Sequence, residues 1–158
     1  MCLRKEVTDL LPAVAGLLVC SVAAYTDYKY RKIYNYLVLV TIVVAVLIHR
    51  TKIIPNLIHA LILFTFLVIV AFILKDTSMG GDIKFLSALA MLLGKDVYFA
   101  ITVTCVLFLV AGVVIYVKNY NKLDRGFLRF KLPLGVFLPF GVFALLLLKI
   151  ITQGGIKL

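Results

Sequence analysis

The chain has 158 residues, 64% of them hydrophobic, and 17 Lys and Arg against 7 Asp and Glu, which gives a net charge of +10. This composition, with a mean hydropathy of +1.14, excludes an ordinary soluble domain. The basic residues cluster in short connections between apolar runs, as is typical of membrane orientation and contact with anionic lipids, so the charge does not indicate nucleic-acid binding. We therefore expect a single all-α, polytopic membrane domain over residues 1–158, with no separate soluble domain.

The cysteine pattern gives no sign of a metal site. Cys2, Cys20 and Cys105 are an odd number and form no C-x-x-C pair, so they provide neither a zinc site nor a disulfide framework. We expect buried thiols that pack as small apolar groups, and no metal or other cofactor.

The first three apolar runs cover residues 10–24, 36–48 and 53–74. A helix needs about 20 apolar residues to cross about 30 Å of hydrocarbon, so each run is a candidate span. The first could also be a cleavable signal peptide, because a basic start precedes it and small residues end it. The spans that follow at once favour a retained helix. We predict a polar connection from Asp27 to Asn35, and Pro55 fits the first turn of the third helix.

The fourth run, from Asp82 to Gly94, extends only about 20 Å as a helix, which is short of a full crossing. It begins at the end of the segment Ser78-Met79-Gly80-Gly81-Asp82-Ile83-Lys84, whose glycines permit a sharp turn and close approach of another chain. One end of so short a helix must lie below the membrane surface, where protein or a water-filled cavity covers its backbone. We expect Asp82 at that recessed end, where the helix dipole favours an ionised carboxylate.

Two more runs, 97–117 and 133–151, complete about six spans. The stretch 132–141 should be irregular, because Pro139 removes a helical hydrogen bond. With six spans, the connections after spans one, three and five share one side, which places Asp27 and Asp82 together. That side carries ten Lys and Arg and the other side seven, so the positive-inside rule places the aspartates at the cytoplasmic face.

Two carboxylates near membrane depth are the candidate chemistry of this chain, because ionisable groups there are rare and mostly functional. If Asp27 and Asp82 lie within a few ångströms of each other they share a proton, so that one serves as base and the other as acid. Such a pair activates water for peptide hydrolysis without a covalent intermediate. Asp27 could instead be an interfacial charge or a helix cap. Three other aspartates are expected in solvated loops: Asp76, Asp96 and Asp124.

Several sequence elements resemble those of the type IV prepilin peptidases. The family's D-x3-R-x-I-P-N element is matched by Asp27, Arg31, Ile33 and Asn35, with Tyr34 in place of the proline. Its G-x-G-D-x-K element is matched by Gly81, Asp82 and Lys84, with Met79 in place of the first glycine and Gly80 beside it. The run 89–94 and the pattern of the last span also match, the latter at Pro133, Gly135 and Gly141. The matches follow the family's order and cover most of the chain.

The resemblance implies an aspartic endopeptidase, embedded in the cell membrane, that removes the leader of prepilin-like or preflagellin-like precursors at the cytoplasmic face. Asp27 and Asp82 would be its catalytic pair. The matched elements would supply the supporting residues Gly80, Gly81, Lys84, Arg31 and Asn35. The chain resembles the short, peptidase-only form, similar to Tad-pilus prepilin peptidases and archaeal preflagellin peptidases, without a methyltransferase domain. Its partners would be the precursor protein and membrane lipids.

Three other functions remain open from the sequence. A presenilin-like or signal-peptide-peptidase-like protease also uses a Gly-Asp motif but cuts within transmembrane helices; the small size of the chain and the basic segment after Asp27 disfavour it. A proton-coupled transporter would relay protons through Asp27 and Asp82, yet both acids are expected toward one face. A non-catalytic scaffold would use these polar residues only to hold helices together.

Overall fold

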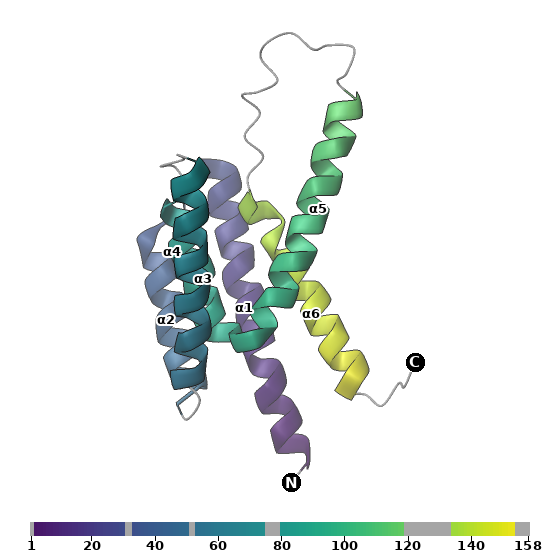
Figure 1. Cartoon of the computed structure of the whole chain (residues 1–158). Helices are drawn as coiled ribbons and strands as arrows, with labels where there is room; N and C mark the ends of the chain where they lie inside the picture. The colour runs from purple at the N-terminus through teal and green to yellow at the C-terminus, as the bar shows by residue number, and fades with distance from the viewer. Residues whose placement is uncertain (1, 31–32, 51–52, 75–79, 119–133, 154–158) are drawn as a thin grey trace.

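The structure is a computed structural model that describes residues 2–30, 33–50, 53–74, 80–118 and 134–153. Over these residues the chain is helical and contains no strand, which confirms the predicted all-α class. Successive α-helices run in alternate directions along one bundle (Figure 1). The elements are α1 (Cys2–Tyr30), α2 (Asn35–Ile48), α3 (Ile53–Leu74), α4 (Gly80–Leu93), η2 (Gly94–Asp96), α5 (Val97–Lys118), η5 (Leu134–Val136) and α6 (Leu138–Gln153).

Three described stretches are long and apolar enough to cross a membrane: Leu10–Tyr30, Ile53–Ile73 and Gly80–Ile115, the last of which takes in both α4 and α5. Two shorter apolar helices, Asn35–Ile48 and Leu138–Thr152, accompany them. Large apolar side chains on the outer faces of the helices are exposed, which suits contact with lipid tails. The membrane class is thus supported, while the count of six spans stays a prediction.

α4 is the central helix of the bundle. It packs against α2 and α3 and also contacts α1, and its buried residues include Phe85, Leu89 and Leu92. A helix that is apolar and buried around most of its circumference belongs in an interior. The neighbouring helices therefore enclose α4, and it can hold the segment that begins at Gly80 in a fixed position.

The connection between α1 and α2 is shorter than the predicted stretch from Asp27 to Asn35. α1 continues to Tyr30 and α2 already begins at Asn35. No glycine or proline interrupts the helix there, and Lys29 in its last turn complements the helix dipole. The Lys29 ammonium also lies 5.3 Å from the centroid of the Tyr30 ring, a favourable cation–π distance. Asp27 is therefore a helical residue whose direction is set by α1.

The predicted short fourth helix is confirmed, since α4 has 14 residues. Its C-terminal end is covered by protein: His49 Nε2 donates to the carbonyl of Leu92 at 2.8 Å, and Asn56 Nδ2 donates to that of Met91 at 3.2 Å. Carbonyls in the last turn of a helix lack partners within the helix, and at membrane depth such groups must be satisfied by protein or water. The turn into α5 accordingly lies inside the length of the neighbouring helices (Figure 1). That Asp82, at the opposite end of α4, is recessed stays a prediction.

The start of the last helix is irregular, as predicted, because the 3-10 helix η5 precedes α6. Pro139 does not break a helical hydrogen bond, contrary to the prediction. It lies in the first turn of α6, where its missing N–H is not needed. Gly141 allows α6 to touch α5, because a Cβ at this position would overlap Thr104 Oγ1 and the carbonyl of Ala100.

Candidate active site

Asp27 lies near the C-terminal end of α1 and is partly buried. Its carboxylate oxygen Oδ2 accepts a hydrogen bond of 2.9 Å from the backbone N–H of Gly135 in η5. A Cβ on Gly135 would lie 3.0 Å from the Cβ of Asp27 and closer still to Oδ2. Only glycine lets the backbone approach the acid this closely, so Gly135 fixes the orientation of the Asp27 side chain.

Asp82 lies in the first turn of α4, where it is also partly buried. The preceding Gly81 lies against the connection between α1 and α2: a Cβ there would be 3.5 Å from the carbonyl oxygen of Ile33 and 3.7 Å from its Cβ. Gly80 faces open space, with no atom within 4 Å of a Cβ placed on it. The glycine pair therefore has one member in contact with the α1–α2 connection and one with room beside it.

These contacts bring together segments that are far apart in the sequence. α1 contacts α4 and η5, and the C-terminal end of α1, the N-terminal end of α4 and η5 all lie toward the same end of the bundle (Figure 1). Asp27 and Asp82 are thus carried by two packed helices at one end, which we call the aspartate end. A third segment, η5, contributes a hydrogen-bond donor there.

The supporting residues named from the sequence are only partly placed. Lys84 on α4 and Asn35 at the start of α2 are exposed, so neither is enclosed by the bundle. Arg31 lies outside the described residues, as do Asp76 and Asp124. Within the described parts of the chain, no three His, Cys, Asp or Glu side chains gather as metal ligands would.

The opposite end of the bundle holds a different set of polar groups. Asp96 in η2 forms an ion pair of 2.6 Å with Lys149 on α6, and both side chains are partly exposed, Lys149 by 19% and Asp96 by 27%. Asp96 is therefore not the solvated loop residue that the sequence predicted. His59 Nδ1 lies 3.3 Å from the hydroxyl of Tyr98, near the same end. These contacts join η2 to α6 and α3 to α5, far from the aspartate end.

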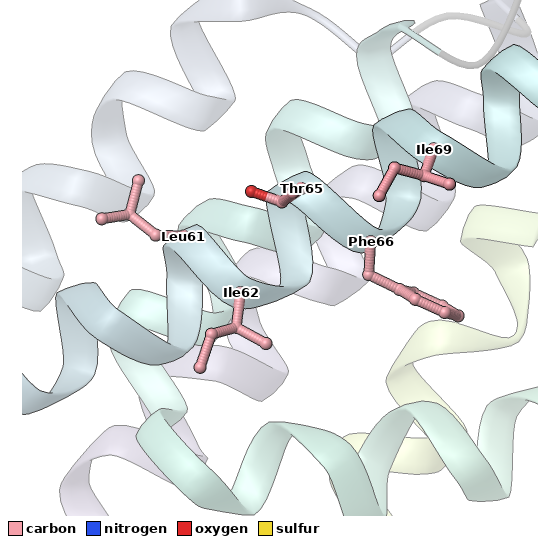
Figure 2. Close-up of a pocket in the computed structure, with 5 residues that line it drawn as sticks. All are labelled: Leu61, Ile62, Thr65, Phe66 and Ile69. Atoms are coloured by element: carbon pink, nitrogen blue, oxygen red, sulfur yellow. The ribbon is translucent and has the colours of Figure 1, made fainter.

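A shallow groove on α3 lies apart from the aspartates. It is lined by Leu61, Ile62, Thr65, Phe66 and Ile69, all from this one helix, and its only polar lining group is the hydroxyl of Thr65 (Figure 2). A site with no titratable group offers no acid or base. The groove therefore belongs to the apolar outer surface of the bundle.

Gly135 is the site residue to which the sequence assigned no role. In the sequence Gly135 is only one member of the proline and glycine pattern of the last span. It lies 108 positions from Asp27 along the chain. No helical or strand periodicity links residues so distant. A glycine directly before an apolar helix was the one local signal, because it marks a place where backbones can approach closely.

Comparison with known families identifies the chain. Residues 14–116 match the type IV leader peptidase family, a stretch that contains both Asp27 and Asp82 and covers more than half of the sequence. No curated protein and no solved structure matches the chain. The prediction of a prepilin peptidase from the sequence elements is confirmed at the level of the family: the chain belongs to the type IV leader peptidase family.

Proposed function

We propose that this protein is an aspartic endopeptidase of the cytoplasmic membrane that removes the leader of type IV prepilin-like precursors at the cytoplasmic face. The observation that carries the proposal is the placement of Asp27 and Asp82 at one end of the bundle, on helices that pack together. Membership of the leader peptidase family favours this function over a transporter or a passive scaffold.

The chemistry follows from two carboxylates that share a proton. The ionised member accepts a proton from water as the water attacks the scissile carbonyl carbon, and the protonated member donates a hydrogen bond to the carbonyl oxygen. Collapse of the tetrahedral intermediate then transfers a proton to the leaving amine and restores the pair. Which aspartate starts as the acid is a property of the coupled pair.

Gly135 has a defined part in this scheme. Its N–H engages one oxygen of Asp27, so the carboxyl group is held in one orientation while it exchanges protons. A neutral donor stabilises a carboxylate less than a cation would, so it leaves Asp27 able to take up a proton. Gly135 is therefore a positioning residue.

The glycine pair suits a peptide substrate. The open space beside Gly80 lets an extended backbone lie next to the start of α4, close to Asp82. The apolar helix that follows the leader in a prepilin-like precursor would pack along the outer faces of the enzyme's helices, where small residues allow close contact.

The proposal is tested with the purified protein in liposomes and a panel of type IV prepilin-like precursors. Mass spectrometry should show at least one precursor shortened by its leader, with the mature part intact. A precursor that a known prepilin peptidase cleaves under the same conditions serves as the positive control. If every such precursor stays at its full mass while the protein is folded, the proposed activity is wrong.

A further inference from the structure

An exposed aromatic surface lies at the aspartate end, on the end of α1 and the start of α2. Five of the chain's eight tyrosines fall within residues 25–36, and all five are exposed, Tyr28 by 75% and Tyr25 by 61%. Together with Lys29 they form what we call the tyrosine surface: Tyr25, Tyr28, Lys29, Tyr30, Tyr34 and Tyr36.

Five members of the tyrosine surface are linked by ring and cation contacts, and the sixth, Tyr28, lies on the same helix as Tyr25, Lys29 and Tyr30. The Tyr34 ring lies 5.9 Å from that of Tyr30, edge to face, and 5.6 Å from that of Tyr36, stacked. The Lys29 ammonium lies 5.8 Å from the Tyr25 ring and 5.3 Å from the Tyr30 ring. Rings at these distances attract each other and the cation, so these five residues form a continuous patch that joins the end of α1 to the start of α2.

The chemistry of this patch matches the headgroup region of a bilayer. A tyrosine has an apolar ring and a polar hydroxyl, and such side chains are enriched where hydrocarbon meets water. Tyr25, Tyr28, Lys29 and Tyr30 lie in the last turns of the candidate span Leu10–Tyr30, which is where an interfacial belt belongs, and the other two tyrosines lie at the start of α2. Lys29 adds a cation that attracts anionic headgroups.

Because Tyr28 and Asp27 lie on the same helix, the depth of Tyr28 in the membrane determines the depth of Asp27. Tyr28 and Asp27 are successive residues of α1, so their Cα atoms differ in height by only about 1.5 Å along the helix axis. Tyr28 is exposed, whereas Asp27 is turned toward η5 and bonded to Gly135. One turn of α1 therefore carries an exposed tyrosine, Tyr28, and an acid that faces η5, Asp27, at nearly the same height along the helix axis.

We infer that the tyrosine surface lies in the headgroup region of the membrane, binds anionic phospholipid, and thereby fixes the depth of Asp27 in the bilayer. The inference does not depend on the proposed peptidase activity. If that activity is present, the anchor selects peptide bonds that lie at the membrane boundary.

Tryptophan fluorescence tests the depth, because the chain contains no tryptophan. Tyr28→Trp places a single fluorophore in the patch, and Phe66→Trp, on an exposed position within α3, places one within a long span. Each variant is reconstituted into nanodiscs whose lipids carry a nitroxide either at the headgroup or in the middle of the acyl chain. We expect Tyr28→Trp to be quenched at least about twofold more by the headgroup label, and Phe66→Trp to show the reverse preference.

Aqueous iodide is the third quencher. If Tyr28→Trp is quenched by iodide and by neither lipid label, the patch faces water and is free for a protein partner, and the inference is overturned. Stronger quenching by the acyl-chain label would overturn it as well. Both readouts are independent of peptide cleavage, so they separate failure of the anchor from failure of the proposed activity.

Thermal unfolding in detergent tests the lipid preference. Added phosphatidylglycerol should raise the melting temperature of the wild type more than phosphatidylcholine does, and Lys29→Gln should reduce this difference. Inorganic phosphate should have no such effect, because the patch combines a cation with apolar rings. An equal response to both lipids, or an equal response of Lys29→Gln and the wild type, contradicts the anionic part of the inference.

Discussion

The two ends of the bundle use their polar groups in different ways. At the far end, Asp96 is neutralised by Lys149 at 2.6 Å, and the carbonyls at the end of α4 are capped by His49 and Asn56. At the aspartate end, Asp27 is held by the neutral N–H of Gly135. A paired and capped group contributes to the fold but cannot readily exchange protons. The two ends therefore differ in the charge of the group that meets the acid: Asp96 pairs with a cation, whereas Asp27 accepts a hydrogen bond from a neutral backbone N–H.

The largest expected effect comes from removing one carboxylate of the proposed pair. Asp27→Asn and Asp82→Asn should each lower the rate of leader removal by about 10²-fold to 10⁴-fold, the range for loss of general acid–base catalysis. The matched change at the far end, Asp96→Asn, should leave cleavage near the wild-type rate. Cleavage of a co-expressed precursor, followed by mass spectrometry, measures all three. An equal loss of cleavage rate in Asp96→Asn would mean that the acid at the far end is as important for cleavage as Asp27 and Asp82.

A smaller loss of activity is expected from Gly135→Ala. The added Cβ would lie 3.0 Å from the Cβ of Asp27, so the acid must move, and misplacement by about 1 Å can lower a rate by about 10²-fold. We expect kcat to fall with little change in KM, because the substrate contacts remain. Gly112→Ala is the control, since a Cβ there meets nothing within 4 Å. An unchanged kcat in Gly135→Ala would show that this glycine does not position the acid.

At the far end, the backbone at Gly94 should matter for stability more than for chemistry. Gly94 has φ of 60°, and a Cβ there would lie 2.6 Å from Asn56 Oδ1. Gly94→Ala should lower the free energy of unfolding by about 1–3 kcal/mol, the cost of a strained backbone. Denaturant unfolding in detergent measures the change, again with Gly112→Ala as the control. A stable Gly94→Ala protein with strongly reduced cleavage would reverse the roles assigned to the two ends.

The smallest effect is expected for the ion pair itself. In a double-mutant cycle with Asp96→Asn and Lys149→Gln, the coupling should be about 1 kcal/mol or less, as for most partly exposed pairs. Thermal or denaturant unfolding of the four proteins gives this value. A coupling of several kcal/mol would mean that the pair is effectively buried from water and central to the helix reversal.

The sequence predicted the helices well wherever apolar runs have sharp limits. α3 spans Ile53–Leu74 as expected, because charged residues on both sides bound a mainly apolar run that contains no Lys, Arg, Asp or Glu. The sequence predicts the end of the first helix too early, because hydropathy falls at Asp27. No helix-breaking residue follows Asp27 in α1, which continues to Tyr30. Helix length at a membrane boundary depends on contacts as well as on hydropathy, and here α1 packs against η5.

The sequence predicts the two acids of the candidate site but not the groups that contact them. Asp27 and Asp82 stand out in the sequence because acids next to apolar runs are rare and mostly functional, and Asp82 also follows a glycine pair. The bond from Gly135 depends on how α6 meets α1, which is a tertiary contact with no signal in local sequence. The caps from His49 and Asn56 on α4 are missed for the same reason, because each joins residues of different helices.

The most direct test of the central claim is whether Asp27 and Asp82 meet. Asp27→Cys and Asp82→Cys are combined in a background where Cys2 and Cys105 are replaced by Ser and the buried Cys20 by Ala. A short bifunctional thiol reagent, applied to the protein in liposomes, should link these two positions, while the pair Asp27→Cys and Asp96→Cys should stay unlinked. Mass spectrometry of the digested protein identifies the linked peptides. If both thiols react singly but are never joined, the two acids do not share a water molecule and the account is contradicted.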